Sequence, residues 1–322
     1  MKSRQCGVTL IELLVALLIS STIMAAVSGI FLQSRRSFTK QQVLSNIVED
    51  GRYATEIMAQ ELRRVGFLVN AVRNDAGFKN TDIFFADNNP VGSGIVFNAG
   101  DYIKGKSSVA GFNVGNDKNQ VVFRYQLDPA GTCTDPDNPL IPPDVVNKAE
   151  CFEKGYTWAQ TPNDFDAGNT PCSGQVDDEN GIFVGGVEVS AYIKTIYFFV
   201  NDIGDGPTLY CRAVTQYKNG TIIDNNGGNA IPIVSNVESM YVLYGVDTDG
   251  DNNANRYVSA TAVADWQTVV SVRVYLVLMS SEINVAIGNT STYKIDGYIQ
   301  NALNPNDKRL YRVFTTTVAF RN

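Results

Sequence analysis

One acidic segment, DTDGDNNAN, has the oxygen spacing of a calcium-binding loop. Asp247, Asp249 and Asp251 match the first three ligand positions of a helix-flanked calcium loop, and Asn255 matches a later one. An asparagine stands at the sharp turn in place of glycine, and a valine stands where the bidentate glutamate belongs. Two alternatives stay open, a weak Ca²⁺ site and a solvated turn between strands, and the turn is favoured because Asp, Asn and Gly are turn residues.

Cysteine and histidine usage narrows the chemistry further. The chain has 5 cysteines and no histidine, which excludes Ser-His-Asp and Cys-His catalysis and every histidine-ligated metal site. Cys6 lies in a short basic N-terminal leader, and the remaining cysteines are even in number: Cys133, Cys151, Cys172 and Cys211. An even number is typical of disulfides in an exported domain. We expect the nearest-neighbour pairing, 133 with 151 and 172 with 211; free thiols and a four-sulfur zinc site are the alternatives.

A carboxylate lies inside the most apolar segment of the chain. Residues 8–32 contain Glu12 as their one charged residue, and residues 13–32 carry no charge. A segment of that length crosses a hydrocarbon core of about 30 Å as a helix. A carboxylate there costs about 2.5–3.5 kcal/mol, so Glu12 is a candidate functional residue that needs a partner. A secretory signal or signal anchor is the alternative, but no clear cleavage site follows the apolar run.

One long helix is expected to position these groups. No proline occurs before Pro90, so nothing interrupts a helix over residues 8–66. Apolar side chains then recur at spacings of three and four at Leu44, Ile47, Ala54, Ile57, Met58, Leu62 and Val65. That period predicts an amphipathic second half that packs on a globular head, with Gly66 as the stop. The first half, residues 8–32, is the predicted transmembrane part.

A β-rich head is expected over residues 67–322. Candidate strands cover residues 94–97, 121–127, 193–200, 208–214, 237–245, 269–279 and 310–320. The strict alternation from Val270 to Leu278, with Arg273 on the other, polar face, predicts an antiparallel sheet with one face on the helix and a polar outer face. The turn sequence NDIGDGP predicts a hairpin between the third and fourth candidates. Residues 132–175 are predicted to form a disulfide-stapled loop insertion on the head.

Composition excludes several function classes. The 322 residues are 44% hydrophobic and 18% charged, too apolar for a disordered chain. The net charge of −7 argues against a nucleic-acid partner, whose binding surfaces are basic. Carboxylates are plentiful, but no motif organises them into a catalytic pair. We therefore expect a protein that is not an enzyme.

The N-terminal residues GVTLIELL resemble the processing site of type IV prepilins. In that family a prepilin peptidase cuts after the glycine and methylates the new N-terminus. The resemblance implies that Gly7 and Val8 flank the cut, that residues 1–7 are the cleaved leader, and that Val8 is N-methylated. It implies that Glu12 is the assembly carboxylate, paired with an N-terminal amine. Val8 departs from the usual phenylalanine or methionine.

Four further blocks resemble PilW-type minor pilins: residues 51–67, 209–212, 237–251 and 266–276. This likeness implies an α+β, type IV pilin-like fold and a minor pilin that primes and assembles type IV pili near the filament tip. The implied partners are other minor and major pilins, a tip adhesin, the prepilin peptidase and the inner-membrane assembly platform. The implied location is the inner membrane, as a single-pass protein with its head in the periplasm, and then the pilus at the cell surface. The alternative is a J-type pseudopilin of a type II secretion system.

Overall fold

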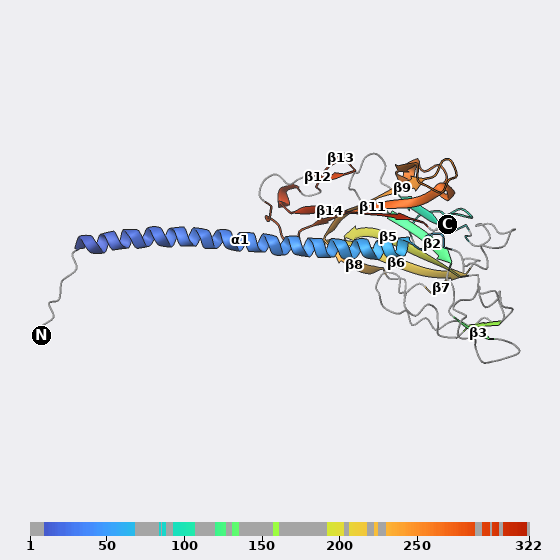
Figure 1. Ribbon diagram of the computed structural model, residues 1–322, viewed down its shortest axis with the longest axis horizontal. Helices are drawn as coiled ribbons and strands as arrows, with labels where there is room; N and C mark the ends of the chain where they lie inside the picture. The colour runs from blue at the N-terminus through green and yellow to red at the C-terminus, as the bar shows by residue number, and fades with distance from the viewer. Residues whose placement is uncertain are drawn as a thin grey trace.

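A single long helix extends from a β-rich head (Figure 1). The computed structural model describes residues 10–67, 84, 86–87, 93–106, 120–126, 131–134, 157–160, 192–202, 206–217, 222–224, 230–286, 292–296, 298–302 and 305–320. All strand pairings among these residues are antiparallel. The architecture is the α+β, pilin-like one that the sequence predicts: a long N-terminal helix packed on antiparallel sheets.

The helix α1 (Leu10–Leu62) is continuous over 53 residues. At ~1.5 Å of rise per residue it is about 80 Å long. Gly29 lies inside it and does not break it. A turn follows the helix, and in it Gly66 has a positive φ of 71°. Helices often end at a residue in this left-handed conformation, which glycine adopts at little steric cost. The predicted uninterrupted helix is confirmed over the described residues.

The head contains two main sheets in place of the one that the alternation suggested. The first has the order β1-β2-β5-β6-β7, with β8 also paired to β6: β1 (Ile103–Lys106), β2 (Gln120–Gln126), β5 (Tyr192–Asp202), β6 (Pro207–Tyr217), β7 (Ile222–Asp224) and β8 (Ile231–Ser235). The second has the order β10-β9-β11-β14: β9 (Val237–Val246), β10 (Arg256–Val258), β11 (Val269–Met279) and β14 (Tyr311–Ala319).

Short elements complete the described head. Two small hairpins pair β3 (Gly131–Thr134) with β4 (Thr157–Gln160), and β12 (Thr292–Ile295) with β13 (Tyr298–Asn301). Three 3-10 turns are η5 (Ala260–Ala262), η6 (Trp266–Thr268) and η7 (Pro305–Asp307). The predicted loop insertion at 132–175 thus includes all of the β3–β4 hairpin except Gly131, and its other residues lie outside the described part of the chain.

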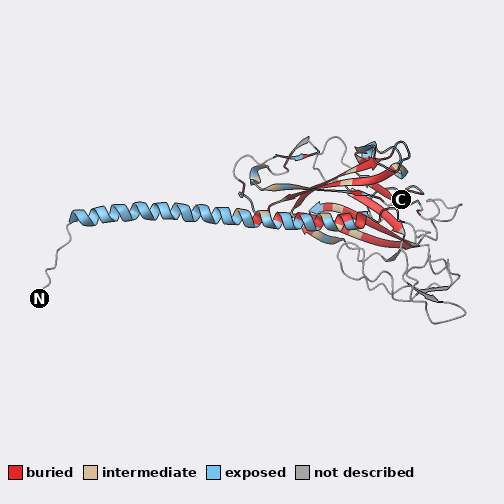
Figure 2. Cartoon of the chain, viewed as in Figure 1, coloured by how far each residue is buried: buried red, intermediate tan, exposed pale blue. Residues whose placement is uncertain are grey.

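The main core lies where the two sheets and the second half of α1 meet. Figure 2 shows burial concentrated in the head and in the end of α1 that it holds. From the helix it contains Val43, Ile47, Ala54, Met58 and Leu62. From the sheets it contains residues such as Phe123, Phe198, Leu209, Tyr244, Val274 and Leu276. The apolar period in the second half of α1 therefore correctly predicted which face of the helix packs on the head.

The prediction of a polar outer face on β11 was wrong. Val274 and Leu276 face the main core, but Tyr275 and Val277 belong to a second buried cluster on the opposite face. The hairpin β12–β13 contributes Tyr293 and Ile295 to that cluster. The outer face is therefore covered because a hairpin packs on it, and Arg273 remains half-buried there.

The predicted strand at residues 94–97 is also wrong. Phe97 forms only an isolated bridge with Asp87, and the segment lies across the outer face of the first sheet. There the fully buried Arg124 places its guanidinium carbon 4.1 Å from the Phe97 ring centre, and its Nη2 is 3.4 Å from Asp87 Oδ2. Burial lowers the pKa of Arg124 to about 10, against the opposing effect of Asp87 and Asp101. The segment is held by this buried cation and by the two backbone hydrogen bonds of the Asp87–Phe97 bridge, and not by a continuous strand pairing.

Candidate assembly site

The first half of α1 is an apolar surface with no cover from its own chain. It is the one described helix long and apolar enough to cross a membrane, judged by length and composition, and none of its most apolar window is buried. The large apolar side chains that it exposes include Leu13, Leu14, Leu17, Leu18, Ile19, Ile23, Val27, Ile30 and Phe31. A continuous apolar surface of this kind marks a membrane or protein contact site.

Hydroxyl groups within the apolar half are satisfied by the helix itself. Ser20 Oγ donates to the Ala16 carbonyl at 2.7 Å, and Thr22 Oγ1 donates to the Ile19 carbonyl at 2.8 Å. Ser21 bonds back in the same way at 2.9 Å. Internal bonding of this type lets serine and threonine sit in an apolar environment without an unpaired polar group. Over residues 13–32, which carry no charge, the surface is therefore compatible with lipid.

Glu12 lies in the first turn of α1 and is exposed. An acidic side chain is favourable near a helix N-terminus, where the free N–H groups carry partial positive charge. The predicted cleavage residues, Gly7 and Val8, lie outside the described residues. Their roles and that of Glu12 stay predictions.

The second half of α1 is fixed to the head at two places. Gly51 lies so close to the Phe314 ring of β14 that any Cβ at that position would overlap the ring. At the helix end, the Gly66 N–H donates to the Arg124 carbonyl at 2.9 Å, and the Arg64 guanidinium lies 5.6 Å from the Tyr125 ring centre. The helix thus packs on β14 of one sheet, and the turn that follows it is fixed to β2 of the other.

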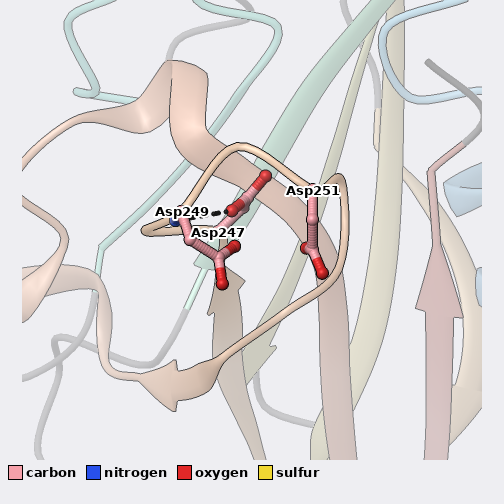
Figure 3. A group of neighbouring side chains, drawn as sticks. All are labelled: Asp247, Asp249 and Asp251. Carbon is pink, nitrogen blue, oxygen red and sulfur yellow. Dashed lines mark hydrogen bonds between the residues drawn. The ribbon is translucent and has the colours of Figure 1, made fainter.

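The acidic loop after β9 brings its three aspartates together. Asp247, Asp249 and Asp251 each place a carboxylate oxygen within 4.8 Å of the others (Figure 3). The Asp247 carboxylate accepts backbone hydrogen bonds at 2.7–3.0 Å from three loop residues: Asp249, Gly250 and Asn252. These bonds, the one from Gly250 first, lower the pKa of Asp247.

Asn255 is committed to holding the same loop together. Its side-chain oxygen accepts from the Thr248 N–H at 2.6 Å, and its side-chain nitrogen donates to Asp249 at 3.1 Å. Asn252 has a positive φ of 63°, which asparagine tolerates in place of the missing glycine. The loop is stable by its own bonds, as expected for a solvated turn, and the calcium alternative stays a prediction.

Only one predicted disulfide residue has a described side chain. Cys211 is fully buried in β6 and is disulfide-bonded. Cys133 lies in β3, but its side chain is outside the described part, as are Cys151 and Cys172. The pairing therefore stays a prediction.

Two family models match the chain, one at each end. The prokaryotic N-terminal methylation motif matches residues 2–28, which contain the leader and the start of the apolar helix. The type IV pilus-assembly protein W model matches residues 196–322, which contain β6, β9, β11 and β14. No curated protein and no solved structure matches the chain significantly.

These matches fit the geometry of the chain. An apolar helix that follows a methylation motif indicates anchoring in the inner membrane before pilus assembly. Pilin-family proteins are structural proteins and not enzymes. Over residues 196–322 the chain is therefore similar to the PilW family of type IV pilus-assembly proteins, and at its N-terminus it carries the methylation motif of prepilins.

Proposed function

We propose that this chain is a minor pilin that primes assembly of the type IV pilus and lies near the filament tip. The observation that carries the proposal is the division of α1: its first half is wholly exposed and apolar, and its second half buries one face against the head. An apolar helix half with no cover from its own chain is suited first to lipid and then to a bundle of equivalent helices.

Processing would prepare the helix for that transfer. Cleavage between Gly7 and Val8 would remove the basic leader and create an N-terminal amine at Val8. The Glu12 carboxylate would then pair with the N-terminal amine of a neighbouring subunit. Opposite charges attract more strongly in apolar surroundings than in water, so a misplaced subunit would leave a costly unpaired charge. The pair would thereby set the axial register of the new subunit.

The head would supply contacts outside the membrane. Before assembly it would lie in the periplasm, and afterwards on the pilus at the cell surface. There its partners would be other minor and major pilins and a tip adhesin, and before that the prepilin peptidase and the inner-membrane assembly platform. An oxidising periplasm is consistent with a disulfide at Cys211, and we propose Cys172 as its partner and a second bond between Cys133 and Cys151.

For the loop that begins at Asp247 we propose a solvated turn. The Asp247 carboxylate already accepts three backbone hydrogen bonds, and this role in the turn explains why an aspartate stands there without a metal. Weak Ca²⁺ binding by Asp247, Asp249 and Asp251 is the alternative, because their oxygens are close enough to share an ion.

Deletion of the gene tests the proposal directly. Sheared surface pili and secreted exoenzymes are measured in the same deletion strain, and the gene is restored in trans as the control. Loss of pili with intact secretion supports the minor-pilin proposal. Intact pili with lost secretion would instead assign the protein to a type II secretion system as a pseudopilin.

A further inference from the structure

The last strand of the head, β14, lies at the edge of its sheet. The sheet order β10-β9-β11-β14 places β11 on one side of β14, and no other described strand pairs with its second side. The pairing with β11 runs without a register shift from Ser271↔Ala319 to Met279↔Tyr311. The strand therefore presents one regular backbone edge along its 9 residues.

The hydrogen-bonding direction along β14 follows from bonds at its two ends. The Phe320 N–H donates to the Val270 carbonyl at 2.9 Å, and the Leu310 carbonyl accepts from the Ser280 N–H at 2.9 Å. Even-numbered residues therefore bond to β11, because successive residues of a strand alternate in direction. The N–H and C=O groups of residues 311, 313, 315, 317 and 319 point away from the sheet, and Thr315, Thr317 and Ala319 are exposed.

This edge carries few of the features that keep sheet edges from pairing. Natural edge strands are usually short, bulged, interrupted by proline or lined with lysine. The sequence YRVFTTTVA contains no proline, no lysine and one charged residue, Arg312, and its register with β11 contains no bulge. Threonine and valine are also strong strand formers. The edge is therefore suited to receive a further strand.

The position of β14 indicates where such a strand comes from. Phe314 packs on Gly51, so the strand lies along the docked half of α1. Val48 is next to Gly51 on the helix surface, three residues before it, and is 40% exposed. The other half of the same helix exposes the apolar surface that neighbouring subunits must cover. A subunit that packs along α1 therefore approaches the edge of β14.

We propose that the edge of β14 that no other described strand occupies pairs with an extended strand from the head of a neighbouring subunit that is a different pilin. This inference rests on the proposed function. The added strand bonds to the outward backbone groups of residues 313, 315, 317 and 319, and β-branched or apolar side chains on one of its faces contact Val48. Backbone pairing of this kind gives affinity, while alternate side chains give specificity.

A proline at Thr315 tests the proposal in assembled pili. Proline is tolerated at edge positions whose N–H faces solvent, so Thr315→Pro removes an outward donor while the ladder to β11 is kept. We expect its level in sheared filaments to fall about tenfold relative to its level in membranes. The matched variant Thr315→Val keeps the N–H and measures the contribution of the hydroxyl, with a loss of at most about twofold. Equal incorporation of the two variants would overturn the proposal.

A photocrosslinking amino acid at position 315 identifies the occupant. The probe is p-benzoylphenylalanine in the full chain in piliated cells, and the same probe at the exposed Ala264 is the control. We expect an adduct with another pilin from position 315 only. An adduct with a second copy of this chain, no adduct, or equal adducts from both positions would each overturn the proposal.

The two proposals fail in different ways. If deletion of the gene leaves pili intact, the proposed function is wrong. If deletion abolishes pili but Thr315→Pro assembles as Thr315→Val does, the function stands and the strand pairing is wrong. Resistance of each variant to trypsin in membranes, relative to the unmodified chain, identifies a variant that fails because its head is misfolded. In that case the crosslinking result decides.

Discussion

The contact between Gly51 and Phe314 predicts that Gly51→Ala lowers the free energy of unfolding when Phe314 is present and raises it when Phe314 is replaced by alanine. Gly51→Ala has two opposing consequences. Alanine favours a helix interior over glycine by about 1 kcal/mol. Its Cβ, however, would overlap the Phe314 ring, and overpacking of this kind costs about 1–3 kcal/mol. In the unmodified head we therefore expect Gly51→Ala to lower the free energy of unfolding by up to about 2 kcal/mol.

Removal of the ring should reverse that effect. In a Phe314→Ala background the overlap is gone, and Gly51→Ala should raise the free energy of unfolding by about 1 kcal/mol through helix propensity alone. The coupling between the two positions is then about 1–3 kcal/mol, which a double-mutant cycle measures. Phe314 is only half-buried, so Phe314→Ala itself should cost less than the about 3–5 kcal/mol typical of a fully buried ring.

Guanidinium unfolding of the full chain in detergent micelles is the assay. Trp266 packs edge-on on the buried Tyr244 ring, with ring centres 4.8 Å apart, so its fluorescence follows the core of the head. Gly29→Ala is the control, because nothing lies within 4 Å of a Cβ there. It should not change the unfolding of the head. Additive effects of Gly51→Ala and Phe314→Ala would refute the packing of α1 on β14.

Three further predictions concern the assembly residues and the acidic loop. Glu12→Ala should leave cleavage of the leader intact and abolish incorporation into sheared filaments. The control Glu49→Ala, which removes an exposed acid on the same helix, should assemble. Normal filament levels of Glu12→Ala would contradict the pairing role. Gly7→Val should block processing, so that co-expression with the prepilin peptidase gives no mass decrease; an unchanged decrease would move the cleavage site. The melting temperature of the purified chain should be the same in millimolar Ca²⁺ and in chelator; a calcium-dependent rise that Asp249→Asn removes would establish the metal site in place of the turn.

Periodic segments were predictable because burial imposes the period. The predicted strand 269–279 coincides with β11, and the predicted strand 310–320 contains β14. The spacing of Ile47, Ala54 and Met58 predicted the face of α1 that packs on the head. In each case one face of one element meets a large core, so the pattern is visible without knowledge of the partner.

Contacts between distant segments were not predictable in this way. The outer face of β11 was expected to be polar, and Tyr275 was a signal against it, because a large aromatic ring on that face needs cover. Nothing in the sequence identified β12–β13 as that cover. Likewise, the burial of Arg124 depends on Phe97 and Asp87, which are far from it in sequence and meet it only in the fold.

The candidate assembly residue Glu12 was recognised by a different kind of signal. Glu12 stands out because charge inside an apolar segment is costly, and that argument needs no tertiary structure. The edge of β14 stands out only after the strand order is known, because TTTV has the same local pattern in a central strand as in an edge strand. Resemblance located the candidate processing site, and topology located the candidate pairing site.

These two sites must also agree in register. Glu12 and Gly51 belong to one continuous helix, so at ~1.5 Å of rise per residue they lie about 58 Å apart along its axis. Gly51 is in contact with Phe314, which fixes β14 relative to Glu12. Successive outward groups on β14 recur about every 7 Å, twice the rise of a strand residue. A subunit positioned by the proposed Glu12 pair can therefore use the β14 edge only if its own strand lies at a matching height, and a mismatch at either site would exclude the wrong neighbour.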